Sequence, residues 1–384
     1  MSTSMVSFPQ SGGRTAFLDN LRASLTALVI CHHCNAAYGS IGGWDYVVRE
    51  PGGMVTELLA TLFAGVTQAF FMSSFFLLSA YFTAPAYDHR GAAGFMGRRL
   101  VRLGIPLVFY YCVLSVVLSY LVQCFRGHCD VGFVDYFASH FLRYGGPGPL
   151  WFAWALLIFE TVYVVFRQIS DRLGRIPKSY ALPNDRQVFA FIVGIGVFTF
   201  IFRQWFPLAF HFLHMRLAYF PLYVCMFTLG IVAYRSGWFE RLEARQANLW
   251  WRVSLGAIAV APVLLIVNAW LGYDPYKFWS GFNWQCCSYA VWEAFLCVGI
   301  NMKLIVVFRD RFSVSTPFSR RMTRSAYTAY ILHAFFVCGW TYVFTFFSLG
   351  RIPEIVLMWP FAVGSCFLFA DGVRRLPLVR RVVG

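Results

Sequence analysis

Apolar residues recur along this chain in stretches of about 20, separated by short polar segments. Each stretch is long enough to cross roughly 30 Å of hydrocarbon as an α-helix. The pattern predicts ten membrane-spanning helices, near residues 22–41, 60–83, 103–125, 149–166, 188–205, 217–235, 252–271, 285–308, 325–346 and 354–371. We therefore expect an all-α integral membrane protein, a single bundle of about ten transmembrane helices.

The composition agrees with a chain whose main solvent is lipid. Of the 384 residues, 59% are hydrophobic and only 13% are charged, whereas a soluble domain averages about 25% charged residues. The mean hydropathy is +0.61. The segments between the predicted helices are too short for a separate soluble domain. We expect a cytoplasmic tail over 1–16, a transmembrane domain over 17–371 and a basic cytoplasmic tail over 372–384.

The net charge of +15 is distributed unevenly along the chain. If both termini are cytoplasmic, 24 of the 32 Lys and Arg residues fall on the cytoplasmic side. This asymmetry is typical of the positive-inside rule and predicts the orientation. No nucleic-acid-binding module surrounds the basic segments, so we expect no nucleic-acid partner. Residues 1–16 lack the features of a cleavable signal peptide, and the first predicted helix should act as the targeting signal.

The first predicted helix carries a polar stripe. On a helical wheel, Asp19, Arg22, Thr26 and His33 share one face. At 1.5 Å per residue, His33 lies about 16 Å from Arg22, deep in the bilayer. An ionisable group at that depth is expensive and usually functional, and a neutral imidazole suits a general base. The alternative is a structural histidine bonded to another helix, which fits His32 better.

Cysteines raise two further questions. Cys31-His32-His33-Cys34 suggests a metal site, but His32 and His33 diverge on one helix, so the four side chains cannot converge on one ion. We expect no metal. Cys124 and Cys129 lie at the outer end of the third predicted helix, and the sequence leaves open whether they form a disulfide.

Arg98, Arg99 and Arg102 begin the third predicted helix. Arg99 and Arg102 are three apart and project from one face, and a pair of guanidinium groups matches a phosphate-bearing ligand. On spacing alone, arginines that anchor the helix at the membrane surface are the favoured alternative.

Three ionisable residues lie within later predicted helices, namely Glu160, Glu293 and His333. Each should face the protein interior, because exposure to lipid would be costly. The sequence leaves open whether their roles are structural or catalytic.

Several segments, in order along the chain, resemble motifs of the acyltransferase family 3 membrane enzymes. They are 17–23 followed by His33, 75–82, 98–102 with Pro106, 150–152, 325–333 and the tail 374–381. The glucan- and polysaccharide-modifying, OpgC-like type is a near neighbour. The chain departs from the usual pattern at Asn20 and at Ala80, where the family usually has glycine. Neither change removes a group expected to do chemistry.

The resemblance implies a multi-pass enzyme of the bacterial cytoplasmic (inner) membrane. It would transfer a short acyl group, acetyl or succinyl, from cytoplasmic acyl-CoA to a hydroxyl of an extracytoplasmic glycan or glycolipid. Its partners would thus be acyl-CoA, the acceptor and the lipid bilayer.

Site residues follow from the same resemblance. His33 would act as general base or transient acyl acceptor. The other candidates are Asp19 and Arg22 in the catalytic set, Arg98, Arg99 and Arg102 for the phosphates of CoA, and Trp151, Tyr330 and His333 as substrate-binding or supporting residues. Glu293 joins the catalytic set because it is a carboxylate within a predicted span, and not through the resemblance.

Two other classes of protein would also use many spans and buried polar groups. One is a transporter or flippase for a lipid-linked saccharide, and the other is a non-catalytic membrane scaffold or sensor. Neither requires a histidine aligned with an arginine pair. The acyl group, the acceptor and the oligomeric state stay open.

Overall fold

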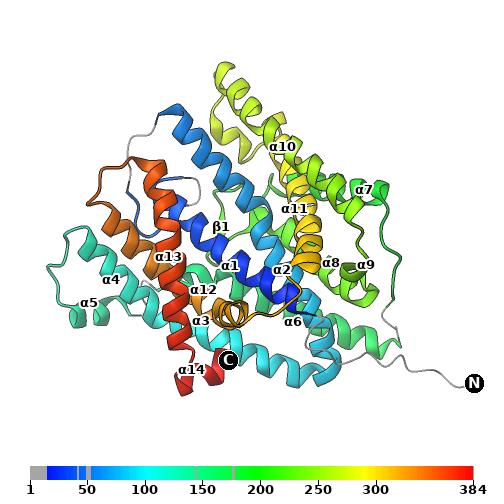
Figure 1. Cartoon of the computed structure of the whole chain (residues 1–384), viewed down its shortest axis with the longest axis horizontal. Coiled ribbons are helices and arrows are strands. Elements are labelled where there is room, and N and C mark those ends of the chain that lie inside the picture. The colour runs from blue at the N-terminus through cyan, green and yellow to red at the C-terminus, as the bar shows by residue number, and fades with distance from the viewer. Residues whose placement is uncertain are drawn as a thin grey trace, which may run out of the picture.

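The computed structural model of the chain describes residues 15–40, 43–48, 53–141, 143, 145–174 and 178–383. Most of the expected N-terminal tail lies outside the described residues. So do Gly42 and Pro177, which lie in loops between predicted spans, and the last residue, Gly384. The described part is a bundle of helices with one short hairpin (Figure 1).

Each of the ten predicted spans contains a helix. The helices are α1 (Ala16–Ala36), α2 (Met54–Arg99), α3 (Ile105–Phe109) continuing into α4 (Ser115–Phe125), α6 (Trp151–Arg172), α7 (Asp185–Phe202), α8 (Phe220–Ser236), α10 (Ala244–Trp270), α11 (Trp284–Arg311), α12 (Pro317–Phe344) and α13 (Arg351–Val373).

Seven segments of the described chain are long and apolar enough to cross a membrane. One of them, Met54–Phe125, covers two of the predicted spans. The two remaining spans correspond to α1 and α12, which carry more polar residues than the others. The prediction of an all-α membrane protein is confirmed.

The second and third spans are joined differently from the expected loop. Helix α2 runs on into two π-helical turns, η1 (Leu100–Gly104) and η2 (Tyr110–Leu114), which flank α3. The chain changes direction at Gly91, where φ is 66° and ψ is 176°. A glycine adopts this conformation readily because it has no Cβ. The sharp turn at Gly91 therefore takes the place of the loop expected between the second and third spans.

Helix α1 lies in the middle of the bundle, with α13 on one side and α11 on the other (Figure 1). It also packs against α2 and α12. Leu18, Leu21 and Leu25 belong to the main hydrophobic cluster, whereas Ile30 and Cys34 belong to a second cluster with residues of α12 and α13. Because protein surrounds α1, its polar residues can contact other helices instead of lipid.

We call the end of the bundle where α1 begins and α13 ends the terminal face, and the other end the opposite face. Short elements cover both. At the opposite face they are α5 (Phe133–His140), η3 (Gly148–Leu150), the antiparallel strands β1 (His211–Phe212) and β2 (Met215–Arg216), η4 (Leu217–Tyr219) and η5 (Pro275–Phe278); at the terminal face they are α9 (Trp238–Arg241) and α14 (Pro377–Val383).

A packing contact and a disulfide join further segments of the chain. Helix α14 contacts η1, and its last residue, Val383, is buried. Cys124 and Cys129 are joined by a disulfide, with their Cα atoms 4.8 Å apart. The question that the sequence left open at these cysteines is thus answered in favour of a bond.

Candidate active site

A cavity of about 1040 Å³ lies in the half of the bundle next to the opposite face. It is walled by the end of α1, the start of α2, the β1–β2 hairpin and the facing ends of α10 and α11. Many of its wall residues are aromatic, among them Trp44, Trp151, Tyr219, Tyr223, Tyr289, Trp292 and Tyr330. Three residues predicted from the sequence, His33, Trp151 and Tyr330, line this one cavity.

The ring of His33 is held between two other rings. It stacks on Trp44 with centroids 4.1 Å apart and on His333 with centroids 5.1 Å apart. Within the described residues its Nδ1 is enclosed and has no hydrogen-bond partner. His33 is half-buried and lines the cavity, so Nε2 is the ring nitrogen that reaches the cavity.

His333 stands behind His33 and is fully buried. Its Nδ1 lies 2.7 Å from the carbonyl oxygen of Tyr330, which assigns the N–H to Nδ1 and leaves Nε2 as an acceptor. That Nε2 has no partner among the described residues. The hydroxyl of Tyr330 donates to the carbonyl of Pro149 in η3. A half-buried and a fully buried histidine thus stack on each other, and each has an enclosed ring nitrogen without a partner among the described residues.

His32 differs from its neighbour. Its Nδ1 is hydrogen-bonded to the hydroxyl of Thr67 at 2.7 Å, and its ring packs on Phe71 with centroids 4.9 Å apart. These are the contacts expected of a structural histidine. Across the ranges that the structure describes, no group of three or more His, Cys, Asp or Glu side chains is arranged to hold a metal ion.

Arg99 is fixed by a carboxylate from another helix. Its Nε lies 3.0 Å from Oε1 of Glu160, which is fully buried on α6. Thr83 donates to the same oxygen at 3.0 Å. Glu160, whose role the sequence left open, is therefore the partner that orients the Arg99 guanidinium.

Arg22 and Arg102 lie near Arg99. Arg22 donates to Asp19 at 3.2 Å, and its guanidinium is within electrostatic range of those of Arg99 and Arg102. The Tyr327 hydroxyl donates to the backbone carbonyl of Arg102 at 3.1 Å. Asp19 and three of the predicted arginines thus gather at the terminal face, which we call the arginine cluster (Arg22, Arg99, Arg102). Arg98 is exposed beside it.

The cavity and the arginine cluster are separate spaces. No residue of the cluster is among the described residues that line the cavity. They are linked by one stripe of α12, because Tyr327, Tyr330 and His333 follow one another at intervals of three. From the first to the last of these residues the helix rises about 9 Å.

Glu293 is buried beside the cavity and does not line it. It forms an ion pair with Arg203, which is also fully buried, at the end of α7. The Arg203 guanidinium lies 5.0 Å from the ring of Tyr289 and 5.6 Å from the ring of Tyr219. Both tyrosines line the cavity, so Glu293 can act on the site through them. Arg203 is not among the residues predicted from the sequence, although an arginine on the side with few basic residues is a signal that could have found it.

The mouth of the cavity is shaped by loops. In the β1–β2 hairpin, Nε of Arg216 donates to Nε2 of His211 at 3.0 Å. The turn residues Leu213 and His214 have positive φ angles of 49° and 62°, a conformation that costs energy outside glycine and often marks functional segments. Across the mouth, burial raises the pKa of the Asp45 carboxyl, partly offset by Arg126.

Comparison with known proteins identifies the family of the chain. A family model described as "Acyltransferase domain", that of acyltransferase family 3, matches residues 15–371. Similar curated proteins include glucans biosynthesis protein C of Escherichia coli O1:K1 / APEC and of Escherichia coli O139:H28 (strain E24377A / ETEC). Each is 28% identical over 174 residues, which is 44% of this chain and 44% of the relative.

The match therefore spans less than half the length of those relatives. No solved structure matches the chain. The family model, in contrast, extends from the first turn of α1 to the end of α13. It includes the arginine cluster, both stacked histidines and every helix that walls the cavity. The chain belongs to acyltransferase family 3, as its motifs predict.

Proposed function

We propose that this chain transfers a short acyl group, acetyl or succinyl, from cytoplasmic acyl-CoA to a hydroxyl of an extracytoplasmic glycan or glycolipid, in the bacterial cytoplasmic membrane. One observation carries the proposal: helix α1 joins the two regions. Near its end it carries His33, which lines the aromatic cavity, and near its start it carries Arg22, which belongs to the arginine cluster. The family supports acyl transfer, and the chemistry of the two ends supports the donor and the acceptor.

The arginine cluster, where we propose that the acyl donor binds, suits a ligand with several negative charges. CoA carries phosphates, and guanidinium groups bind phosphate through paired, charge-assisted hydrogen bonds. Glu160 holds one edge of Arg99, so less side-chain freedom is lost when a ligand binds the other edge. Arg98 adds positive charge at the exposed rim. The excess of basic residues at this end supports a cytoplasmic location for it.

The thioester must then reach His33 from the arginine cluster. We infer that the pantetheine arm runs along the stripe of Tyr327, Tyr330 and His333. The cavity stops short of the cluster, so side chains on this route have to move aside. Tyr330 lies at the junction, because it lines the cavity and packs at 6.4 Å on Phe75 of α2.

In the transfer step, Nε2 of His33 takes the proton of the acceptor hydroxyl as its oxygen attacks the thioester carbonyl carbon. The C–S bond breaks, and CoA leaves as a thiolate that is then protonated. In the covalent alternative, Nε2 itself attacks first and passes the acyl group to the hydroxyl. Stacking on Trp44 and His333 holds the imidazole, while Trp151 and the other aromatic walls offer flat apolar surfaces to the acceptor. Glu293 positions Tyr289 and Tyr219 through Arg203.

The decisive experiment replaces the two adjacent histidines separately. Membranes containing each variant receive labelled acetyl-CoA or succinyl-CoA, and label is followed into the glycan fraction and onto the protein. His33→Ala should abolish transfer while the protein still inserts, whereas His32→Ala should keep measurable transfer. Full activity of His33→Ala would contradict the assignment. Label retained on the wild-type protein would favour the covalent route.

The donor assignment is tested by binding alone. Replacing Arg99 and Arg102 together with alanine should weaken CoA affinity by about tenfold or more, since each charge-assisted hydrogen bond contributes roughly 1.5–3 kcal/mol. Unchanged affinity would contradict the donor site without affecting the role of His33.

A further inference from the structure

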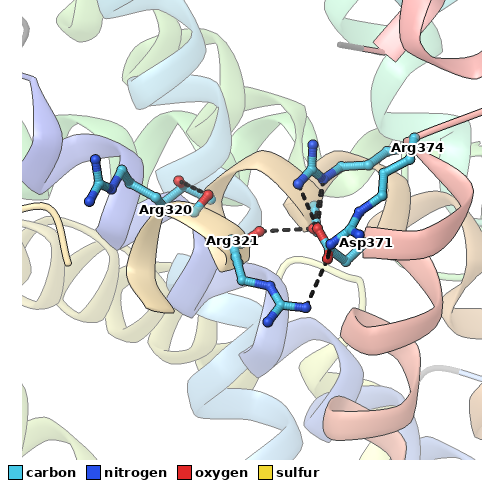
Figure 2. A network of polar contacts seen from close by, with 7 residues as sticks. Arg320, Arg321, Asp371 and Arg374 are labelled. Atoms are coloured by element: carbon cyan, nitrogen blue, oxygen red, sulfur yellow. Dashed lines mark hydrogen bonds and ion pairs between the residues drawn. The ribbon is translucent and has the colours of Figure 1, made fainter. Parts of the chain in front are cut away.

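One buried carboxylate forms ion pairs with three arginines at the terminal face (Figure 2). Asp371, near the end of α13, accepts from Nε and Nη2 of Arg374 at 2.9 and 2.6 Å through its Oδ1. Its Oδ2 accepts from Arg321 of α12 at 3.0 Å and from Arg375 at 2.5 Å. The carboxylate therefore ties α12 to the end of α13.

The three arginines differ in exposure. The Arg374 side chain is 20% exposed, whereas those of Arg321 and Arg375 are 61% and 63% exposed. Arg321 and Arg375 donate to the same oxygen, so their guanidinium groups lie side by side. Each guanidinium has five N–H donors, and each of these two donates through one nitrogen to Asp371 while its side chain is more than half exposed.

Positive charge exceeds negative charge around this pair. The terminal-face part of residues 312–384 holds seven arginines, at 320, 321, 324, 374, 375, 380 and 381, and one carboxylate, Asp371. Arg320 and Arg321 also lie in the first turns of α12, where the helix dipole is positive and disfavours cations. Arginines that only anchor a helix at the membrane surface need no shared acceptor. The single carboxylate of Asp371 compensates only part of the charge of the three arginines that it contacts.

We infer that Arg321 and Arg375, held together by Asp371, form a binding site for a phosphate group. Paired guanidiniums match phosphate oxygens in geometry and charge. The phosphate belongs either to the headgroup of an anionic membrane lipid or to the 3′-phosphate of CoA. The site uses none of the residues assigned to the donor above. Its CoA form rests on the proposed function, and its lipid form does not.

The test uses the full chain in nanodiscs of neutral lipid. Arg321→Gln with Arg375→Gln removes the pair. Arg245→Gln with Arg252→Gln removes the same number of exposed charges on α10, where Arg245 is 78% exposed and lies 3.6 Å from Asp185. One arm titrates short-chain phosphatidylglycerol, and the other compares CoA with 3′-dephospho-CoA. Affinity is measured by native mass spectrometry, and a melting temperature checks that every variant is folded.

For a lipid site, the Arg321/Arg375 variant should bind phosphatidylglycerol about tenfold or more weakly, with the α10 variant unchanged. For a CoA site, the wild type should prefer CoA over 3′-dephospho-CoA, and the same variant should lose that preference. Equal binding of both probes by wild type and variant would overturn the site. So would equal weakening by the α10 variant, because total charge would then explain the effect. Neither arm measures acyl transfer, so failure of the His33 assignment leaves the result interpretable.

Discussion

The arginines of the terminal face and His33 in the cavity are held in different ways. At the terminal face, carboxylates from neighbouring helices fix the arginines, as Glu160 does for Arg99 and Asp371 for Arg321. In the cavity at the opposite face, His33 has no carboxylate partner among the described residues and is held by stacking on Trp44 and His333. Paired guanidiniums suit a charged ligand, whereas an aromatic cavity suits an uncharged one. Under the proposed function, this difference would separate recognition of the donor from chemistry on the acceptor.

The largest effect should come from the cavity. His33→Ala removes the proposed base, and general base catalysis contributes about 10²–10⁴-fold to a rate. We expect a loss of that size in the transfer rate, measured with labelled acyl-CoA at saturating acceptor. His333→Ala should cost less, since it removes a ring that only supports His33. A larger loss for His333→Ala would exchange the roles of the two histidines.

The next effect concerns stability beside the cavity. Arg203→Ala leaves Glu293 buried without its partner, and breaking a buried ion pair costs roughly 3–5 kcal/mol. The loss should appear as a lower midpoint of denaturant unfolding in detergent. Replacing both residues with apolar ones, Arg203→Met with Glu293→Leu, should cost less than Arg203→Ala alone. A double variant less stable than Arg203→Ala would show that the ion pair stabilises the bundle more than an apolar pair does.

A smaller effect should appear at the terminal face. Glu160→Gln keeps the size of the side chain but removes the charge that orients Arg99, and one charge-assisted hydrogen bond contributes roughly 1.5–3 kcal/mol. The KM for acyl-CoA should rise about tenfold or more, with kcat nearly constant. Asp171→Asn, which removes the exposed partner of Arg167, serves as the control. A fall in kcat at constant KM would place Glu160 in the chemistry instead of in donor binding.

The smallest effect should come from removing one hydroxyl group at the junction of the cavity and the arginine cluster. Tyr330→Phe removes the donor to the Pro149 carbonyl and should cost about 1 kcal/mol of unfolding free energy. Transfer should continue, because the ring still lines the cavity. Complete loss of transfer with normal stability would show that the hydroxyl itself takes part in the reaction.

The helices could be predicted from the sequence because length and apolarity are local properties. The reversal at Gly91 could not, since a glycine in the segment between two predicted spans does not reveal the sign of its φ. Helices α1 and α12 were predicted as spans although both carry many polar residues. Their buried polar side chains, such as Thr26 and His333, face other helices. The polar face of α1 can be recognised on a helical wheel, but the helices that it contacts cannot.

The candidate site was predicted in part. Depth in the bilayer singled out His33, and the family resemblance singled out Arg99 and Arg102, for which spacing alone favoured a membrane-surface anchor. Their partners could not be found in this way, because Trp44 lies in the loop after α1 and His333 is 300 positions from His33. Glu160 was predicted to face inward, as it does, but only the structure joins it to Arg99. The roles proposed for all of these residues stay predictions.

Helix α14 has a practical consequence for work with this protein. Its valines pack into the core beside η1, the turn that carries Arg102. A purification tag or fluorescent fusion placed directly after residue 384 would pull on that contact and could be mistaken for a defect in donor affinity. A fusion with a flexible spacer, compared with an untagged preparation, would remove this ambiguity.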